Sequence, residues 1–383
     1  MSPLRVHYLL RLEPGETPER RALDLAREQS VEIVEGAAPA AAEARSVGRV
    51  AALAPAADGR FRATIDFPEA LVGGELPQLV NVLWGNVSLQ RGVRLDRIEW
   101  PPALLARFGG PTHGVAGLRA LCGISARRPL AATALKPVGL SAAELARRAA
   151  ECARGGIDLV KDDHGVADQA WAPFRERVLR VAEAVGEANA ATGGATLYAP
   201  NLTGPADRME ERLAVLAEAG VRAALVAPLL VGLDTVRALA ARSGLLLVAH
   251  PTFALSPAAG DGGLAPEVLF GDLFRLAGAD VVVFPNAGGR FPFTYGECRA
   301  IETRLGAAMG RLAPAALMLG GGVDRARLEE WIPRYGPDLV WLVGGSLYAR
   351  DDVETAAREL AACVRRVAPG EPEHEIGGVR AAT

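Results

Sequence analysis

Four ionisable residues stand in a row directly after a short apolar run. The run is Ile157–Val160, it follows two glycines, and the tract Lys161–His164, with the sequence KDDH, comes next. An apolar run of this length after a glycine break is typical of a strand covered on both faces. Charged groups at a sheltered strand end are costly unless they are paired or bind a metal. Two interpretations follow: a divalent metal site, or a solvated loop with a surface ion pair.

Lysine is rare in this chain. Of its 42 basic residues, only Lys136 and Lys161 are lysines, and both follow apolar runs. A desolvated lysine can lose its proton and act as a base or nucleophile, whereas arginine stays charged. The two lysines are therefore candidates for positions where arginine could not do the chemistry.

Length, charge and composition exclude several classes of function. The chain has 383 residues and a formal net charge of -3, which argue for one or two domains and against nucleic acid as a partner. No apolar segment reaches the roughly 18 residues of a membrane span, and the N-terminus lacks the layout of a secretory signal. The four cysteines form no CxxC pair. We therefore expect a cytoplasmic protein with reduced thiols and without a membrane partner.

Residues 1–112 have the pattern of an α+β domain. Two breaker-rich segments, Trp100–Pro102 and Phe108–Pro111, precede the predicted boundary. The following list gives the elements expected in this part: strands Val6–Leu10, Val47–Ala54 and Arg60–Phe67, helices Thr17–Gln29 and Leu76–Val82, and a turn or strand start at Trp84–Val87.

Residues 113–383 alternate apolar strands with amphipathic helices. Eight strands over about 250 residues predict a (β/α)8 TIM barrel, and a doubly wound sheet is less favoured because no GxGxxG follows the first strand. The eight expected strands are Leu130–Leu135, Ile157–Val160, Thr196–Ala199, Ala223–Ala227, Leu245–Ala249, Val281–Phe284, Ala315–Leu319 and Val340–Val343. The expected helices include Ala142–Arg154, Ala206–Ala219 and Ala326–Trp331.

In such a barrel the chemistry lies at the C-terminal strand ends. Lys136 follows the first expected strand, Asn201 the third and His250 the fifth. His250 could be a ligand, an acid–base group or a buried structural histidine. The seventh and eighth strands are followed by Gly320-Gly321-Gly322 and Gly344-Gly345, whose bare backbone N–H groups could approach a phosphate.

These motifs resemble the large subunit of ribulose-bisphosphate carboxylase (RuBisCO) and the RuBisCO-like proteins. The tract Thr133–Ser141 resembles the family's TxKPKxGLS strand end, and Gly155–Asp163 resembles GGxDxxKDD. The likeness covers almost the whole chain. It implies an N-terminal ferredoxin-like α+β domain before the barrel, and a homodimer whose active sites lie between one barrel and the partner's N-terminal domain.

The resemblance also assigns roles to individual residues. Lys161 matches the lysine that CO2 converts to a carbamate, and Asp163 matches a magnesium-binding aspartate. A carbamate is a hard oxygen ligand suited to Mg2+. Lys136 matches a lysine beside the substrate oxygens, Asn86 matches an asparagine supplied by the partner subunit, and the two glycine tracts match phosphate-binding segments.

The departures from the family pattern bear on the reaction. His164 stands where the family has Glu, so the metal could be held more weakly or be another divalent ion. The carboxylases' histidine–arginine pair after strand five is Ala249-His250 here, and the loop 285–290 lacks the lysine that guards bound CO2. Arg290 lies in that loop. The sequence therefore predicts a RuBisCO-like protein that does not carboxylate ribulose bisphosphate.

A retained enolisation site without the carboxylation groups implies metal-dependent chemistry on a keto sugar phosphate or sugar-acid phosphate. The first hypothesis is decarboxylation of a 3-oxo sugar-acid phosphate of the 3-oxo-isoapionate-4-phosphate type, with a proton supplied by Lys136 or His250. The alternatives are an enolase or isomerase of a methylthioribulose-type phosphate, and a catalytically silent sugar-phosphate binder.

Overall fold

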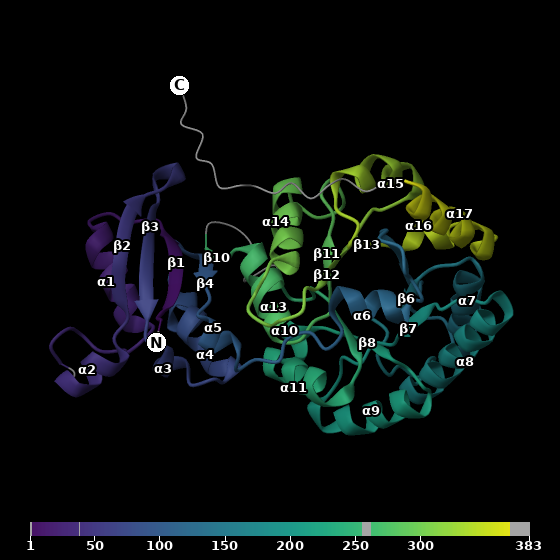
Figure 1. Cartoon of the computed structure of the whole chain (residues 1–383), viewed down its shortest axis with the longest axis horizontal. Coiled ribbons are helices and arrows are strands. Elements are labelled where there is room, and N and C mark those ends of the chain that lie inside the picture. Colours follow the sequence, from purple (N-terminus) through teal and green to yellow (C-terminus); the bar gives the residue numbers. More distant parts are fainter. Residues whose placement is uncertain (1, 38, 255–261, 368–383) are drawn as a thin grey trace.

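The computed structural model describes residues 2–37, 39–254 and 262–367. Two sheets organise them: a five-stranded sheet built mostly from the N-terminal part, and an eight-stranded sheet in the C-terminal part. Figure 1 shows the N-terminal sheet beside the barrel, with the helices α7, α8 and α9 on the outside of the barrel. Within the described residues, no helix is long and apolar enough to cross a membrane.

The N-terminal sheet has the strand order β10-β4-β1-β3-β2. Its central strand β1 (Leu4–Leu10) pairs antiparallel with β3 (Phe61–Phe67) and with β4 (Val93–Glu99). Val93, Leu95 and Ile98 of β4 are buried, and a register shift opposite His7 and Tyr8 interrupts the alternation between Leu95 and Ile98. The other elements of this part are β2 (Arg49–Pro55), α1 (Pro18–Glu28), α2 (Ala40–Ser46), α3 (Glu69–Val72), α4 (Leu76–Trp84), α5 (Pro102–Leu105) and the 3-10 helices Ala57–Gly59 and Asn86–Leu89.

Every one of the eight predicted barrel strands overlaps an observed strand. The strands are all parallel, and an isolated bridge between Asn201 and Leu225 joins the two ends of the sheet, so that the barrel is nearly closed. The predicted fold class is thereby confirmed. The strands are β5 (Leu130–Ala134), β6 (Leu159–Lys161), β7 (Leu197–Ala199), β8 (Ala223–Val226), β9 (Leu246–Ala249), β11 (Val281–Pro285), β12 (Ala316–Gly320) and β13 (Val340–Val343).

Helices connect these strands. The helix α7 (Ala142–Arg154) begins at a capping box in which Ser141 and Glu144 bond each other's backbone N–H, so the chain after β5 is fixed close to Lys136. The remaining helices are α6 (Gly114–Leu121), α8 (Phe174–Thr192), α9 (Met209–Glu218), α10 (Pro228–Val231), α11 (Leu233–Ser243), α13 (Phe274–Leu276), α14 (Tyr295–Gly306), α15 (Arg325–Trp331), α16 (Gly345–Tyr348), α17 (Val353–Arg366), the 3-10 helices Ala206–Arg208 and Ile332–Arg334, and the π-helix Glu267–Leu273.

Three details differ from the prediction. The expected turn at residues 84–87 is the end of α4 followed by the 3-10 helix Asn86–Leu89. The expected helix over residues 206–219 is a 3-10 turn, Ala206–Arg208, followed by α9. The strand β4 was not predicted, because charged residues at its exposed positions interrupt the apolar pattern.

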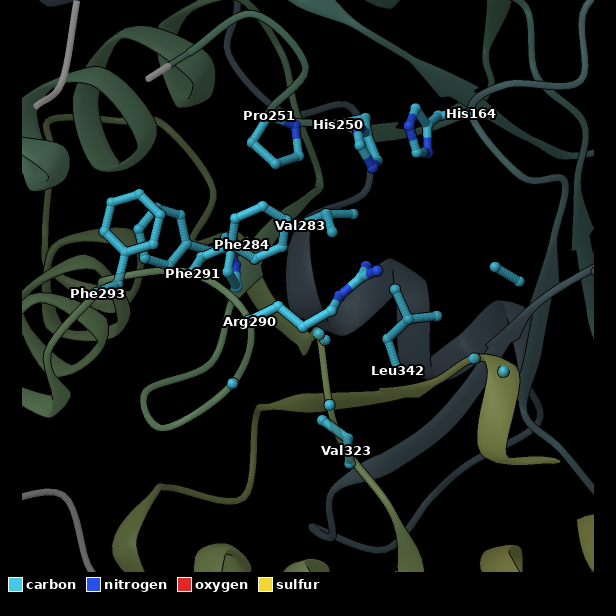
Figure 2. Close-up of a pocket in the computed structure, with 18 of the residues that line it drawn as sticks. His164, His250, Pro251, Val283, Phe284, Arg290, Phe291, Phe293, Val323 and Leu342 are labelled. Carbon is cyan, nitrogen blue, oxygen red and sulfur yellow. The ribbon is translucent and has the colours of Figure 1, made fainter. Parts of the chain in front are cut away.

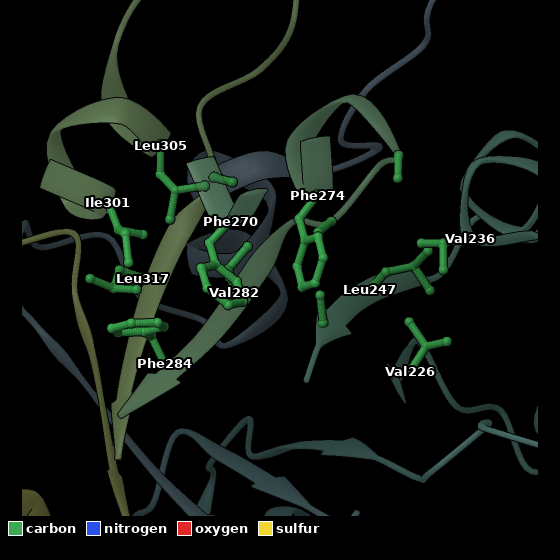
Figure 3. Packing of buried hydrophobic residues seen from close by; sticks show 14 of the residues in the cluster. Val226, Val236, Leu247, Phe270, Phe274, Val282, Phe284, Ile301, Leu305 and Leu317 are labelled. Atoms are coloured by element: carbon green, nitrogen blue, oxygen red, sulfur yellow. The ribbon is translucent and has the colours of Figure 1, made fainter. Parts of the chain in front are cut away.

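Aromatic side chains fill the layer between the barrel and its outer helices. Phe270 packs edge-on against Phe274 and Phe284, with ring centroids 5.2 and 4.9 Å apart. Figure 3 shows Phe284 and Leu317 on the strands facing Ile301 and Leu305 on α14. This packing fixes β11, the strand that leads into the loop carrying Arg290.

The N-terminal sheet is attached to the barrel through shared secondary structure and one buried carboxylate. The short strand β10 (Gly263–Leu264) pairs with β4. Asp272, which is 1% exposed, accepts a hydrogen bond of 3.1 Å from Trp100 Nε1 and forms an ion pair with Arg304. Trp100 thus links the end of the N-terminal part to the barrel.

Replacing Trp100 with Phe tests this link. The variant removes one N–H donor to a buried carboxylate, and we expect the free energy of unfolding to fall by about 1–2 kcal/mol. Urea unfolding followed by circular dichroism measures it. Trp171, which is 48% exposed, gives the matched control, and Trp171→Phe should change stability by less than about 0.5 kcal/mol. Equal unfolding midpoints for the two variants would contradict the assignment.

Candidate active site

Strand alternation decides which side chains enter the barrel mouth. Successive side chains of a strand point to opposite faces. In β6, Leu159 belongs to the inner barrel core, so Lys161 and then Asp163 continue the inward row. The same alternation carries Lys136 beyond β5 and His250 beyond β9. All four of these polar side chains line one cavity at the C-terminal strand ends.

The cavity has a volume of about 1060 Å³ and two unlike walls. One wall carries the lysines, Asp163 and two histidines. The opposite wall is apolar and is formed by Val283, Phe284, Phe291, Phe293 and Leu342. Figure 2 shows His164 and His250 at one edge of the cavity, with the phenylalanines on the side of the loop after β11. The predicted concentration of site residues at this end of the barrel is therefore found.

Lys161 is the most sheltered cation of the site. It is 1% exposed, and its ammonium donates a hydrogen bond of 3.1 Å to the carbonyl oxygen of Asp162. Burial lowers the pKa of Lys161 to about 8, and the neighbouring charge of Lys136 adds to this, although Asp163 opposes it. A substantial fraction of Lys161 is therefore a neutral amine near physiological pH.

Asp163 is held by donors on both oxygens. Lys136 Nζ donates to Oδ2, and Gly165 N donates to Oδ1 at 2.9 Å. Burial opposes ionisation of this carboxyl, but these two hydrogen bonds outweigh it and hold the pKa of Asp163 below its usual range. His164 Nδ1 lies 3.5 Å from Oδ1. The solvated-loop interpretation does not hold for Lys161 and Asp163, because both are buried.

The two histidines of the site are stacked. The rings of His164 and His250 lie 4.1 Å apart at an interplanar angle of 15°. Burial, together with the charge of Lys161, lowers the pKa of His250 to about 2, and burial also lowers the pKa of His164. His250 Nδ1 is 2.6 Å from Thr252 Oγ1, which fixes the orientation of the ring. Both imidazoles are therefore neutral near pH 7 and available as ligands, and the low pKa makes His250 a poor proton acceptor.

Asp162 points away from the cavity, toward α8. Its carboxylate accepts hydrogen bonds from Arg177 Nε at 3.0 Å, Tyr198 Oη at 2.9 Å and Asn201 N at 2.9 Å. Asp162 and Arg177 are 1% and 0% exposed. This buried ion pair sits between Lys161 and Asp163 in the sequence, so it sets the position of both. The resemblance assigned the metal to Asp163 and gave no role to Asp162.

Two residues expected to contact substrate do not line the cavity of their own chain. The side-chain amide of Asn201 donates to the carbonyl oxygens of His164 and Val166, at 3.0 and 2.9 Å, and so supports the loop after β6. Asn86 is exposed on the N-terminal part, where its amide bonds Glu28 at 2.9 Å. Substrate contact is therefore not a role that the structure gives to Asn201.

The glycine tracts lie where the sequence predicts them. Gly320, Gly321, Gly322, Gly344 and Gly345 all line the cavity. Gly321 and Gly322 have φ angles of 81° and 87°, in the left-handed region that favours glycine. A Cβ at Gly289 would collide with the carbonyl oxygen of Gly321, so the loop after β11 passes close to the first tract.

Sequence reasoning missed the apolar wall and Arg327. Phe291 and Phe293 lie in an irregular loop, where no periodicity marks a side chain as facing a cavity. Arg327 lines the cavity from α15, with Nη1 donating to the carbonyl oxygen of Gly322 at 3.0 Å. In the sequence, the spacing of Asp324 and Arg327 indicates only a helix N-cap. The structure has this cap, in which the Asp324 side chain accepts from Arg327 N.

Comparisons with known proteins indicate one family for this chain. Residues 114–291 match the family described as ribulose bisphosphate carboxylase large chain, catalytic domain. The chain is 42% identical to ribulose bisphosphate carboxylase-like protein 1 of Rhodopseudomonas palustris over 93% of this chain and 96% of the relative. It is 44% identical to 5-methylthioribulose-1-phosphate isomerase of Rhodospirillum rubrum, over 88% of this chain and 91% of the relative.

The solved structures give the same result. The crystal structure of a RuBisCO-like protein from Rhodopseudomonas palustris superposes with a TM-score of 0.87 and 40% identity, covering 97% of this chain and all of the other. The chain belongs to the RuBisCO large-chain family, among the RuBisCO-like proteins.

Breaking the Asp162–Arg177 pair should destabilise the protein strongly. Arg177→Met keeps much of the side-chain volume but leaves a buried carboxylate without its cation, and we expect a loss of about 3–5 kcal/mol. Arg180→Met on the same helix is the control, since Arg180 forms an exposed pair with Glu176 and should cost less than about 1 kcal/mol. Thermal and urea unfolding of both variants measures the difference, and a similar small cost for both would contradict the role of Arg177.

The lowered pKa of Lys161 predicts its reactivity. Because only the neutral amine reacts with cyanate, carbamoylation of Lys161 should rise through about pH 8 in the folded protein and only near 10.5 in the unfolded chain. With two lysines in the chain, peptide mass spectrometry assigns the product without ambiguity. A folded-state midpoint near 10.5 would show that burial does not disfavour the charged form.

Proposed function

We propose that this protein enolises a keto sugar phosphate by moving a proton at the carbon next to the ketone. The observation that carries the proposal is the inward row of Lys136, Lys161 and Asp163 in one cavity with a neutral imidazole pair. Such a row offers cations to hold negative charge on an oxygen and neutral bases to accept a proton. The glycine tracts offer backbone N–H groups to a phosphate.

Isomerisation is the form of this chemistry that we favour. The Rhodospirillum rubrum relative is named as an isomerase of a methylthio-sugar phosphate. The wall of Phe284, Phe291 and Phe293 supports the same class, because a thioether prefers an apolar, aromatic surface. A polyhydroxylated sugar acid would bury hydroxyl groups against that wall without partners, which is costly.

Decarboxylation of a 3-oxo sugar-acid phosphate is the second candidate. The cavity is lined by four cationic side chains, Lys136, Lys161, Arg290 and Arg327, which could serve a carboxylate as well as a phosphate. The enolate left after loss of CO2 would be stabilised by the same groups, so the two candidates differ in the bond that breaks. Carboxylation of ribulose bisphosphate is not proposed, because the carboxylase groups after strands five and six are replaced.

A divalent metal fits the donor set on one condition. Within the described residues, no group of three or more His, Cys, Asp or Glu side chains could hold a metal ion. Asp163 and His164 supply two donors, and a carbamate formed by CO2 on the neutral amine of Lys161 would be the third. An oxygen-rich set of this kind suits Mg2+, while the imidazole admits other divalent ions. A bound ion would polarise the substrate carbonyl.

The chain's own residues divide the remaining work. Lys136 Nζ, hydrogen-bonded to Asp163 and with a 36% exposed side chain, is placed to donate a proton or hold an oxyanion. His250, with its pKa near 2, is neutral at pH 7 and is neither a proton donor nor an effective proton acceptor there. The structure therefore supports Lys136 over His250 as the proton donor.

The homodimer expected from the family stays part of the proposal. Asn86 does not line its own cavity, so any contact with substrate requires a second copy of the chain. A solved dimeric archaeal RuBisCO from Hyperthermus butylicus, 25% identical with a TM-score of 0.85 over 95% of this chain and 90% of its own, is consistent with such an arrangement.

Solvent exchange tests the function. With 5-methylthioribulose 1-phosphate in D2O, NMR should show metal-dependent deuterium incorporation next to the ketone, lost on chelation and restored by Mg2+. Lys161→Met should lower the rate by about a thousandfold, or about 4 kcal/mol, whereas Arg180→Met should not change it. Release of CO2 from a 3-oxo sugar-acid phosphate without exchange on the thiosugar would favour the decarboxylase. Binding without either reaction would identify a silent binder and contradict the proposal.

A further inference from the structure

The cations that line the cavity differ in whether their charge is compensated. Lys136 forms an ion pair with Asp163, and Lys161 donates to a backbone carbonyl. Arg327 pairs with Asp324 at 3.7 Å and donates to Gly322. Arg290 forms no hydrogen bond or ion pair with any other residue that the structure describes, and its guanidinium lies 5.5 Å from the centre of the Phe291 ring.

The loop that carries Arg290 is fixed at both ends. Asn286 is 2% exposed, its backbone N–H bonds Gly320 O at 2.8 Å, and its side chain accepts from Tyr335 Oη at 3.0 Å. At the other end, Thr294 begins α14 with a capping box. Arg290 is thus presented by an anchored loop rather than by a free one.

The side chain of Arg290 points into the cavity. Figure 2 shows it extending from the loop after β11 into the space between Val283 and Leu342. The loop passes so close to the first glycine tract that residue 289 has no room for a Cβ beside Gly321 O. Arg290 therefore borders the first glycine tract, Gly320–Gly322.

We propose that Arg290 binds the phosphate group of the substrate together with the Gly320–Gly322 backbone, and that it makes the site select phosphorylated ligands. The inference rests on the proposed function in taking a sugar phosphate as substrate. A guanidinium presents two parallel N–H donors that match two phosphate oxygens, and the remaining oxygen stays free for backbone N–H groups. The Phe291 ring beside the guanidinium lowers the local dielectric, and a low dielectric strengthens the attraction between the guanidinium and a phosphate.

The alternative anion at this position is a carboxylate. A carboxylate presents only two oxygens, which lie in one plane with the guanidinium fork, whereas a phosphate has further oxygens outside that plane for separate backbone N–H groups. The oxygens of a phosphate can accept from the guanidinium fork and from backbone N–H groups at the same time. The glycine tract next to Arg290 therefore favours phosphate, and the two anions can be compared directly.

Titration calorimetry with inorganic phosphate tests the assignment without any turnover. We expect the wild-type protein to bind phosphate, Arg290→Ala to weaken binding at least tenfold, and Arg290→Lys to weaken it by a smaller factor because the charge remains but the fork is lost. A tenfold change corresponds to about 1.4 kcal/mol. Acetate, as the carboxylate probe, should bind more weakly than phosphate and respond less to Arg290→Ala.

Matched controls separate a direct contact from general electrostatics and from misfolding. Arg180→Ala removes an exposed arginine outside the cavity and should leave phosphate affinity unchanged. Circular dichroism melting should be the same for Arg290→Ala and the wild type, because Arg290 makes no bond to the described fold. Unchanged phosphate affinity in Arg290→Ala, absence of phosphate binding by the wild type, or a larger effect on acetate than on phosphate would each overturn the proposal.

The exchange reaction keeps this test distinct from that of the proposed function. If Arg290→Ala binds phosphate as the wild type does while the wild type still exchanges deuterium into the thiosugar phosphate, the inference on Arg290 fails and the function stands. If the wild type binds phosphate through Arg290 but exchanges no deuterium, the anion site stands and the function fails.

Discussion

The buried pair of Asp162 and Arg177 is the constraint on which the site depends. Along a strand, neighbouring residues face opposite ways, so fixing one of them on the outside fixes the next ones inside. Asp162 is tied to Arg177 and Tyr198 on the outer face, and Lys161 and Asp163 must then face the barrel mouth. An uncompensated carboxylate there would be too costly to bury, so the pair excludes a one-residue slip of the strand end.

The electrostatics of the cavity follow from this placement. Two lysines and two arginines line it against two carboxylates, Asp163 and Asp324. Burial shifts the balance by lowering the pKa of Lys161 and keeping both histidines neutral. The result is a site that attracts an anion, keeps two imidazoles without charge, and holds Lys161 close enough to its pKa for part of it to be a neutral amine. Enolisation needs this combination, because the base must be neutral while the developing oxyanion meets positive charge.

Much of this arrangement was readable from the sequence, and the reasons are local. An apolar run that ends in a polar residue marks a strand end, and the TIM barrel places all such ends together. Lys136, Lys161, Asp163, His164 and His250 were found in this way. The strand β4 could not be predicted, because charged residues interrupt its apolar pattern. The position of Asn201 at a strand end did not reveal its two bonds to the backbone of the loop after β6.

What the sequence could not give is the geometry of irregular segments. Phe291, Phe293 and Arg290 lie in a loop without periodicity, and their direction depends on the anchors at Asn286 and Thr294 and on the close approach to Gly321. This loop contributes both an apolar surface and a cation to the lining of the cavity. A ligand that carries a phosphate at one end and an apolar substituent at the other can satisfy both, whereas a ligand that is polar throughout leaves the aromatic wall in contact with hydroxyl groups. The proposed substrate selection therefore depends on the loop after β11, and the proposed chemistry depends on the residues at the strand ends.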